Sequence, residues 1–427
     1  MILRKLLFFG ILFTGLWLIA CTSTVKKRFL LTEDITFEAI EEVPSGSRSL
    51  NKKAGHRDPI SYVPDTNHLE QFPIRKIRVN FHFVNDIDRK KNFNGQEAVN
   101  FAKAALQTAN QKVAKNNKPW LPPSVDLPGL PKRYKYVLTP RSNDPNDVGV
   151  YCHYDKELYY FVNKGRHKNN YSKSVINKYA IQKDTILNIF IMSHHPDSVK
   201  SKTYKPHQAG IALGSSIKIA GVFGKDAKPW TLSGVLNHEI GHVLGLSHAW
   251  GHDGCDDTPI HPNCWNISKK PPCDTMASNN VMDYNAQQNA WTPCQIGKIH
   301  RNFSSLRSRQ RKLLIRDWCQ LDEQQTVYIR QPTYWKGAKD LAGHIVIDGG
   351  GQLEISNRLA LPKGAKIIVR PGGKLIINNA KIHNDCGELW EGIEVENDGK
   401  RKGEVVFIGK PKLENVRYAV QGSSGEK

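Results

Sequence analysis

The sequence predicts an α/β (α+β) domain followed by a short, all-β, right-handed solenoid-like domain. A strand pattern and then a helical pattern occupy residues 74–116, an order typical of α/β layers. A second helical pattern covers residues 230–246, and short apolar strands separated by glycine follow residue 320. Because 427 residues exceed what one hydrophobic core usually organises, two folded units are expected.

The first domain should begin with a half-buried strand, because apolar and charged residues alternate over residues 74–84. A helix is expected over residues 96–116, where apolar residues spaced three and four apart form one face. That face consists of Ala98, Phe101, Ala102, Ala105 and Leu106. Further strands are expected over residues 135–138, 150–154, 186–192 and 210–219.

The long helix of this domain should cover residues 230–246, with Thr231 or Ser233 as its N-cap. A loop rich in proline, aspartate and cysteine follows it. The next helix is expected to start at Pro293, after a threonine cap, and to end near Trp318.

The second domain contains an internal repeat. The segment Gly351-Gln-Leu-Glu-Ile355 recurs as Gly373-Lys-Leu-Ile-Ile377, an offset of 22 residues. Brief strands and glycine turns at this period are typical of the coils of a β-solenoid. Two clear coils are few, so the array is expected to be short or truncated.

The N-terminus has the pattern of an export signal. Arg4 and Lys5 precede an apolar run over residues 6–18, which is too short to span a membrane comfortably. The following Leu18-Ile19-Ala20-Cys21 resembles a bacterial lipobox, in which the cysteine becomes the lipidated first residue. An ordinary signal peptide with an incidental cysteine is the alternative. Either way, the sequence predicts a protein outside the cytoplasm, anchored to a membrane if Cys21 is lipidated.

The formal net charge is +21, and removal of residues 1–21, with their two positive charges, would leave +19. This charge suggests attraction to acidic polymers, anionic membranes or acidic proteins, but lysine and arginine are spread along the chain, which favours a solvated basic surface. No nucleic-acid partner is therefore expected. In an oxidising compartment, the cluster of Cys255, Cys264, Cys273 and Cys294 predicts disulfides, and four cysteines allow three pairings.

A candidate metal site lies in the long helix. His238 and His242 are four residues apart, so they share one helix face and can bind one zinc ion together. Gly245 allows the helix to end in a left-handed turn, after which His248 can complete a three-histidine site. Three neutral ligands leave a fourth position for water, and Glu239 is placed to take its proton.

These residues match His-Glu-x-x-His-x-x-Gly-x-x-His, and the sequence here resembles the metzincin peptidases. Members of that class have an extended active-site helix and a methionine turn beneath the metal. Met282 is expected to form this turn as a structural floor, and Tyr284 to approach the metal or the reaction intermediate. The closer resemblance is to the pappalysin group, also called cytophagalysins, which includes ulilysin-like enzymes. It rests on residues 245–250, 254–259 and 280–295.

This resemblance implies further features of the loop between the third histidine and Met282. Disulfides are expected between Cys255 and Cys273 and between Cys264 and Cys294. It also implies structural calcium on clustered oxygen ligands, with a solvated acidic turn as the alternative. The expected calcium ligands are Asp253, Asp256, Asp257 and Thr258.

The expected function is that of a zinc metalloendopeptidase that hydrolyses proteins or peptides. The alternative is a surface adhesin or scaffold that uses the solenoid, with an inactive peptidase domain; the intact Glu239 argues against it. Some relatives favour basic residues just after the scissile bond, but residues 285–289 contain no acidic group for this. Residues 22–72 contain no cysteine that could keep the enzyme latent, and whether an aspartate such as Asp58 or Asp65 does so stays open.

The expected organisation has four parts: a lipoprotein signal peptide (1–21), a tether or pro-segment (22–72), the metzincin domain (73–320) and the solenoid-like domain (321–427).

Overall fold

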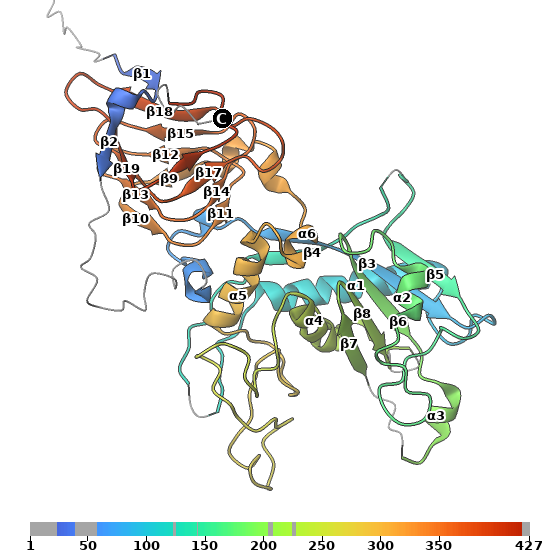
Figure 1. Cartoon of the computed structure of the whole chain (residues 1–427). Coiled ribbons are helices and arrows are strands. Elements are labelled where there is room, and N and C mark those ends of the chain that lie inside the picture. Colours follow the sequence, from blue (N-terminus) through green and yellow to red (C-terminus); the bar gives the residue numbers. More distant parts are fainter. Residues whose placement is uncertain are drawn as a thin grey trace, which may run out of the picture.

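The computed structural model describes residues 24–38, 58–122, 125–142, 144–203, 208–223 and 228–420. Two domains lie side by side, a mixed α/β domain and a stack of short strands (Figure 1). The signal peptide and Cys21 fall outside the described residues. Within the described ranges, no helix combines the length and the apolar character needed to cross a membrane.

A six-stranded sheet forms the centre of the α/β domain, and its strands are parallel except for β7, which is antiparallel to β8. The strand order is β4, β3, β6, β8, β7, and β5 also pairs with β3. The strand β7 therefore forms one edge of the sheet. The bounds are β3 (Arg75–Asn85), β4 (Tyr134–Leu138), β5 (Val150–Tyr154), β6 (Leu187–Met192), β7 (Ala209–Leu213) and β8 (Ser216–Ala220).

The strand β3 is more deeply buried than its alternating sequence predicts. Residues 79–85 are all buried, because β3 has neighbours on both sides and helices cover the sheet. Its buried His82 contacts Asn80 Oδ1 at 3.0 Å and Asn188 Oδ1 at 2.9 Å through Nε2. Burial lowers the pKa of His82 to about 3, so this imidazole is neutral. The polar positions thus form a buried hydrogen-bonded group and not a solvent-facing side.

The single strand expected over residues 210–219 is wrong, because this segment is a hairpin. Leu213 pairs with Ser216 across a two-residue turn. Gly214 has a φ of +74°, a left-handed conformation that glycine adopts without steric cost. The apolar residues continue through the turn, so hydrophobic periodicity alone does not reveal the reversal.

Two helices pack against each other beside the sheet. The helix α1 (Gly95–Ala114) buries the predicted apolar face, and α4 (Leu232–Val243) follows the short 3-10 turn η4 (Pro229–Thr231). Thr231 occupies the N-cap position of α4 without a capping hydrogen bond, while Ser233 Oγ donates to Trp230 O at 2.7 Å. Two short helices, α2 (Ser174–Tyr179) and α3 (Pro196–Lys200), lie in the connections of the sheet.

The helix α5 (Pro293–Ser304) begins as predicted. The side chain of Thr292 accepts from Gln295 N, and that of Gln295 accepts from Thr292 N, which forms a capping box. The helix ends fourteen residues before Trp318, however, and the chain continues as α6 (Arg309–Lys312) and the 3-10 turn η5 (Asp317–Cys319). Ser308 caps α6 by accepting from Arg311 N at 3.0 Å, so a second helix start interrupts the expected single helix.

The C-terminal domain is a solenoid of four coils, each adding one strand to each of three sheets. Its pairing is parallel between coils, and Leu353 pairs with Leu375 at the predicted offset of 22 residues. The offset varies elsewhere, from 18 residues between Val327 and Ile345 to 30 between Lys374 and Glu404. This variation explains why the sequence repeat reveals only two coils.

The coils follow the 3-10 turn η6 (Glu323–Gln325). Their strands are β9 (Val327–Ile329), β10 (Pro332–Trp335), β11 (Lys339–Asp340), β12 (Ile345–Ile347), β13 (Gln352–Ile355), β14 (Leu359–Ala360), β15 (Lys366–Val369), β16 (Lys374–Asn378), β17 (Lys381–His383), β18 (Gly392–Asn397), β19 (Glu404–Ile408) and β20 (Lys412–Leu413).

The N-terminal segment expected to be a tether is partly folded onto the last coil of the solenoid. The strand β1 (Lys26–Phe29) pairs antiparallel with β18, and β2 (Ile35–Glu38) pairs parallel with β19, with the turn η1 (Thr32–Asp34) between them (Figure 1). Leu30 is buried in the solenoid core. The segment therefore covers a sheet edge that would otherwise expose unpaired backbone groups.

Residues 58–72 also belong to the folded structure. The 3-10 turns η2 (Pro59–Tyr62) and η3 (Leu69–Gln71) lie between α5 and the first coil, where Trp335 Nε1 donates to Gln71 Oε1 at 2.9 Å. A Cβ at Gly297 would lie 2.1 Å from Pro59 O, so only glycine permits this approach. Asp58 and Asp65 accept hydrogen bonds from Ile60 N and Asn67 N, which ties both aspartates to local turns.

A buried ionic network joins the two domains. Asp340 in β11 accepts hydrogen bonds from Arg311 at 2.7 and 3.0 Å and from Arg358 at 2.8 Å. Arg75 of β3 donates to Asp340 O at 2.8 Å, and Arg311 also pairs with Asp385 at 2.6 Å. Burial alone would raise the pKa of Asp340, but Arg358 and Arg311 hold it below its usual range. The carboxylate is therefore ionised and paired.

A disulfide between Cys319 and Cys386 lies beside this network and closes 67 residues of chain. No sequence motif indicated this pair. The neighbouring Trp318 donates from Nε1 to Asp385 Oδ1 at 3.0 Å. The covalent link and the ion pairs thus fix the first three coils against the α/β domain.

We expect Asp340→Ala to lower the free energy of unfolding by about 3–5 kcal/mol, because it leaves buried guanidinium groups unpaired. Chemical denaturation would measure this. Asp348→Ala is the control, since Asp348 pairs with the exposed Arg330 and Arg370 and should contribute at most about 1 kcal/mol. Equal losses in both variants would contradict the role of the network. Because the pKa of Asp340 is depressed, its stabilisation should be present above pH 4 and decline as the pH falls further.

Candidate metal centre and substrate cleft

The helix α4 ends in a turn that redirects the chain toward its own imidazoles. Gly245 has a φ of +97°. Its N–H donates to His242 O at 3.0 Å, and Leu246 N–H donates to Gly241 O at 3.0 Å. These two bonds form a Schellman motif, which ends the helix at the predicted glycine. The reversal brings His248 beside the helix.

The Nε2 atoms of the three histidines converge. His242 Nε2 lies 3.2 Å from that of His238 and 3.1 Å from that of His248. His238 Nδ1 lies 2.7 Å from Val281 O, and His242 Nδ1 lies 2.9 Å from Leu246 O. Carbonyl oxygens only accept, so both Nδ1 atoms carry the proton and both Nε2 atoms present lone pairs.

This arrangement fits zinc. Two tetrahedral ligands at 2.0–2.1 Å from an ion would be about 3.3 Å apart, close to the observed spacing. Burial lowers the pKa of His238 to about 3 and that of His248 to about 4, so both imidazoles are neutral, as metal ligation requires. Three converging neutral ligands leave room for water or substrate, which is typical of catalytic zinc sites.

Met282 forms a buried floor under the active-site helix. A Cβ at Gly241 would lie 2.4 Å from Met282 Sδ, so the glycine allows the thioether to pack directly against α4. Met282 N donates to Asn280 Oδ1 at 2.8 Å, and Ala249 N donates to Met282 O at 3.2 Å. The methionine turn thus contacts both the ligand helix and the segment that follows His248.

Glu239 lies between the metal site and the edge strand β7. A Cβ at Gly210 would lie 2.7 Å from Glu239 Oε1, so the carboxyl packs against the strand backbone. The carboxyl also accepts a hydrogen bond from the backbone of Ala212. Burial raises the pKa of Glu239 to about 8. A zinc ion nearby would favour the ionised form.

Aromatic rings cover the solvent side of the histidines. The Tyr284 ring centroid lies 5.4 Å from that of His238 and 5.1 Å from that of His248. Trp250 stacks on His248 at 3.9 Å and contacts Tyr284 at 4.6 Å. Trp250 follows His248 by two residues, but its stacking role was not predicted. Tyr284 remains half exposed and lines the cleft.

The predicted disulfide pairing is wrong. The structure pairs Cys255 with Cys294 and Cys264 with Cys273. The reason lies at the start of α5, where Asp257 accepts from Thr292 Oγ1 and from Cys294 N, each at 2.8 Å. This cap draws the 255–257 segment to the first turn of the helix. Cys264 and Cys273 then close a separate small loop.

The four residues expected to bind calcium have protein partners or face solvent. Asp253 Oδ1 accepts from Thr258 Oγ1 at 2.6 Å and from Cys255 N at 2.9 Å. The ammonium group of Lys298 donates to Asp253 O, and Asp257 caps α5, while Asp256 is exposed. The turn is not the solvated acidic turn of the alternative, because Asp253 and Thr258 are buried, and calcium stays a prediction.

A second cluster of His167, His195 and Asp197 lacks the geometry of a metal site. The imidazoles stack face to face, with centroids 3.7 Å apart and planes 14° from parallel. Imidazole lone pairs lie in the ring plane, so two stacked rings do not direct both toward one ion. Of these two histidine clusters, that of His238, His242 and His248 has lone pairs that point toward one place.

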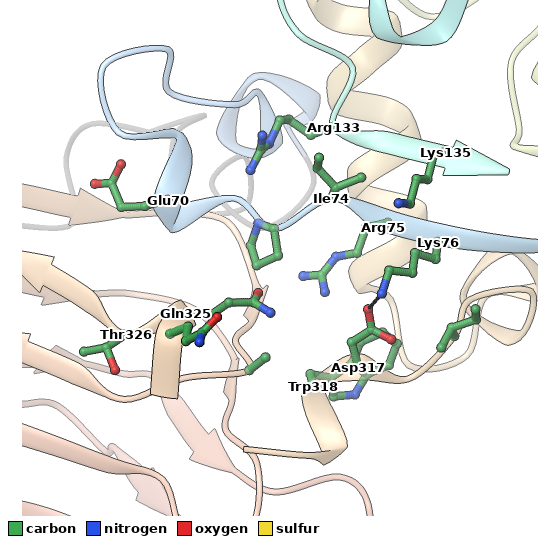
Figure 2. A pocket seen from close by; sticks show the side chains of 14 residues that line it. Glu70, Ile74, Arg75, Lys76, Arg133, Lys135, Asp317, Trp318, Gln325 and Thr326 are labelled. Carbon is green, nitrogen blue, oxygen red and sulfur yellow. Dashed lines mark ion pairs between the residues drawn. The ribbon is translucent and has the colours of Figure 1, made fainter. Parts of the chain in front are cut away.

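A cavity of about 370 Å³ between the domains is lined by several cations (Figure 2). Lys76 pairs with Asp317 at 2.9 Å, and Arg133 donates to the carbonyls of Phe72 and Leu69. Of these cations, Arg75 bonds across the domain interface to the Asp340 backbone, while Lys76 and Arg133 have partners on their own side of it.

The substrate cleft is a cavity of about 740 Å³ beside the histidines. It is bounded by β7, the first turns of α4 and residues 284–288. The sheet with its edge strand, the active-site helix, the three histidines and the methionine turn together define a zinc peptidase of the metzincin class.

Comparison with known proteins places the domain within that class. Residues 170–304 match the model of the peptidase family described as Pregnancy-associated plasma protein-A. The chain therefore carries a metallopeptidase domain of the pappalysin type. No curated protein sequence matches the chain.

Solved structures similar to the chain include two from Tannerella forsythia. Mature mirolysin in complex with a cleaved peptide is 20% identical with a TM-score of 0.39, over 56% of this chain and 95% of that chain. A promirolysin mutant is 16% identical with a TM-score of 0.39, over 58% of this chain and 86% of that chain.

We expect Gly241→Ala to weaken zinc binding by about 10- to 100-fold, as other changes behind metal ligands do. The added methyl would displace Met282 from beneath α4. Competition with a fluorescent zinc chelator would measure the affinity without reference to activity. Gly251→Ala is the matched control, because a Cβ there meets no atom within 4 Å. Unchanged zinc affinity in Gly241→Ala would contradict the role of Met282 as a floor.

Proposed function

We propose that this protein is an exported, lipid-anchored zinc endopeptidase in which His238, His242 and His248 hold the metal and Glu239 is the general base. The observation that carries the proposal is the convergence of the three Nε2 atoms, 3.1–3.2 Å apart, beside a buried carboxyl group. A purely structural role of the three histidines does not explain this convergence, because their Nε2 lone pairs repel one another unless a cation lies between them.

The edge of the sheet supports an endopeptidase. In the described part of the chain, β7 pairs with β8 alone, so its other edge has no strand partner, and the backbone of Ala212 there bonds to Glu239. An extended peptide can add to such an edge through main-chain hydrogen bonds. Because Glu239 packs against Gly210 of β7, a peptide on this edge would have its backbone next to the carboxylate.

The chemistry follows from these positions. Zinc, when bound, supplies a Lewis acid that acidifies a water molecule and polarises the scissile carbonyl. Glu239 accepts the proton of the attacking water and passes it to the leaving nitrogen as the C–N bond breaks. The Tyr284 phenol is placed to donate a hydrogen bond to the developing oxyanion. Zinc is the cofactor of this proposal, and structural calcium at Asp253 to Thr258 is not needed for any step.

We expect Glu239→Gln to lower kcat for a peptide substrate by about 10²- to 10⁴-fold, the usual contribution of general base catalysis. Zinc content should be unchanged, because the amide replaces no ligand. Glu97→Gln, at an exposed position of α1, is the control and should retain activity. A zinc chelator should abolish cleavage by both the parent and the control. Full activity of the Glu239→Gln protein would refute the assignment.

The N-terminal strands support a specific placement at the membrane. The first residue of β1, Lys26, is five positions after Cys21. Five extended residues span at most roughly 18 Å. A lipid on Cys21 would hold the last solenoid coil near the membrane, with the basic strand β1 toward anionic headgroups. The peptidase domain, which is attached through the first three coils, would then lie away from the coil that carries β1.

The expected result of Cys21→Ser in the bacterial host is transfer of the protein from the detergent-extracted membrane fraction to the soluble fraction. The physical reason is the loss of the acyl chains. Immunoblotting of both fractions measures it. Cys152→Ser, at the free cysteine of the described residues, should stay in the membrane fraction. If Cys21→Ser also stays there, the lipid anchor is wrong.

The alternative of an adhesin that binds sugar or peptide through the solenoid would need exposed aromatic side chains such as Trp390 or Tyr418, and both have protein partners. Trp390 is fully buried and donates from Nε1 to Glu414 O at 3.0 Å. Tyr418 stacks on Phe29 of β1 at 4.0 Å. Trp390 is thus part of the core, and Tyr418, although 47% exposed, stacks on β1, so we infer that the solenoid separates the peptidase domain from the membrane.

A further inference from the structure

We propose that the substrate cleft accepts an acidic side chain next to the scissile bond and that Lys112 selects it. This inference rests on the proposed peptidase function and specifies its substrate class. Lys112 lies near the end of α1 and lines the same cavity as His238 and Glu239.

Gly234 opens the wall of the cavity in front of this lysine. A Cβ at Gly234 would lie 3.9 Å from Lys112 Nζ and 2.8 Å from Gln288 Oε1. Gly234 is in the first turns of α4, one helical turn before His238. The ammonium group therefore lies beside α4 about one helical turn from His238, in the lining of the same cavity.

The ammonium group has no acidic partner among the described residues. No ion pair or side-chain hydrogen bond of Lys112 occurs there, and the side chain is partly buried. Burial lowers the pKa of Lys112, which reflects the cost of a desolvated charge without a counterion. A substrate carboxylate would supply the missing counterion, so binding of an acidic residue would offset the desolvation free energy of the Lys112 ammonium group.

A second lysine, Lys132, bonds to the backbone of Lys112. Lys132 Nζ donates to Lys112 O at 2.7 Å and lies 3.9 Å from the Trp291 ring centroid. Burial and the charge of Lys112 lower the pKa of Lys132 well below its usual value. Lys164 adds a positive side chain at the exposed rim of the cleft. Among the described lining residues, the ammonium groups of the cleft are therefore those of Lys112 and Lys164, while the buried Lys132 lies outside the lining.

The remaining walls provide no group that would select a basic side chain. Glu239 is the one carboxylate among the described lining residues, and it faces β7. The segment after Tyr284 supplies neutral amides, and Gln288 Nε2 is fixed by donating to Asp283 O at 2.9 Å. An arginine or lysine in this cleft would meet Lys112 without a counterion. The charge pattern therefore favours aspartate or glutamate.

The experiment is cleavage-site profiling of a proteome-derived peptide library by mass spectrometry. With the zinc-loaded mature protein, we expect aspartate and glutamate to be enriched at one of the two positions that flank the cut. Lys112→Gln should lower the preference for glutamate over glutamine there by about tenfold, between the values for exposed and buried ion pairs. Lys112→Glu should shift the preference to lysine and arginine. Lys103→Glu, at an exposed position of the same helix, should keep the parent profile.

Failure of this inference differs from failure of the proposed function. Cleavage by the parent without acidic enrichment, or an unchanged profile in Lys112→Glu, would overturn the role of Lys112. If the parent protein and the Lys112 variants cleave no faster than Glu239→Gln, the peptidase proposal fails. The role of Lys112 is then tested by calorimetry, which measures the binding of uncleavable peptides. Tighter binding of an aspartate peptide than its asparagine counterpart, reversed by Lys112→Glu, supports it; equal binding overturns it.

Discussion

Three imidazole lone pairs must meet at one point, and this requirement constrains the chain from residue 232 to residue 284. Two of them are fixed by the pitch of α4, while the third depends on the left-handed turn at Gly245. The carbonyl of Val281 orients His238, and Met282 supports the helix from below at Gly241. The ligand helix and the methionine turn therefore form one packed unit, in which each element fixes the position of the other.

The two domains are less separate than their sequences indicate. Residues at both ends of the peptidase domain, Arg75 and Arg311, converge on Asp340 of the first coil. The strands β1 and β2 precede the peptidase domain in the sequence, yet they pair with the last coil of the solenoid, which follows that domain. A lipid at the N-terminus would therefore hold the last coil at the membrane, and the solenoid would set the distance between the membrane and the active site.

The charge of the substrate cleft comes from a part of the chain remote from the metal motif. Lys112 is in α1, more than one hundred residues before His238, and the contact between α1 and α4 brings the two together. A motif read along the sequence identifies the chemistry of the site because its residues lie within one helix and one turn. Substrate preference depends on which distant side chains enter the cleft, and the sequence offered only the segment after Tyr284 for that purpose.

The sequence by itself determined the features that depend on local geometry. These are the helix face of α1, the threonine cap of α5, the left-handed end of α4 and the spacing that places His238 and His242 on one face. The tertiary structure decided those that depend on long-range contact: the pairing of Cys255 with Cys294, the third disulfide, the hairpin of β7 and β8, the two additional coils and the clasp of β1 and β2. The physical reason is that helical hydrogen bonds join residues four apart, whereas disulfides, coil edges and cleft charges join residues that only packing brings together.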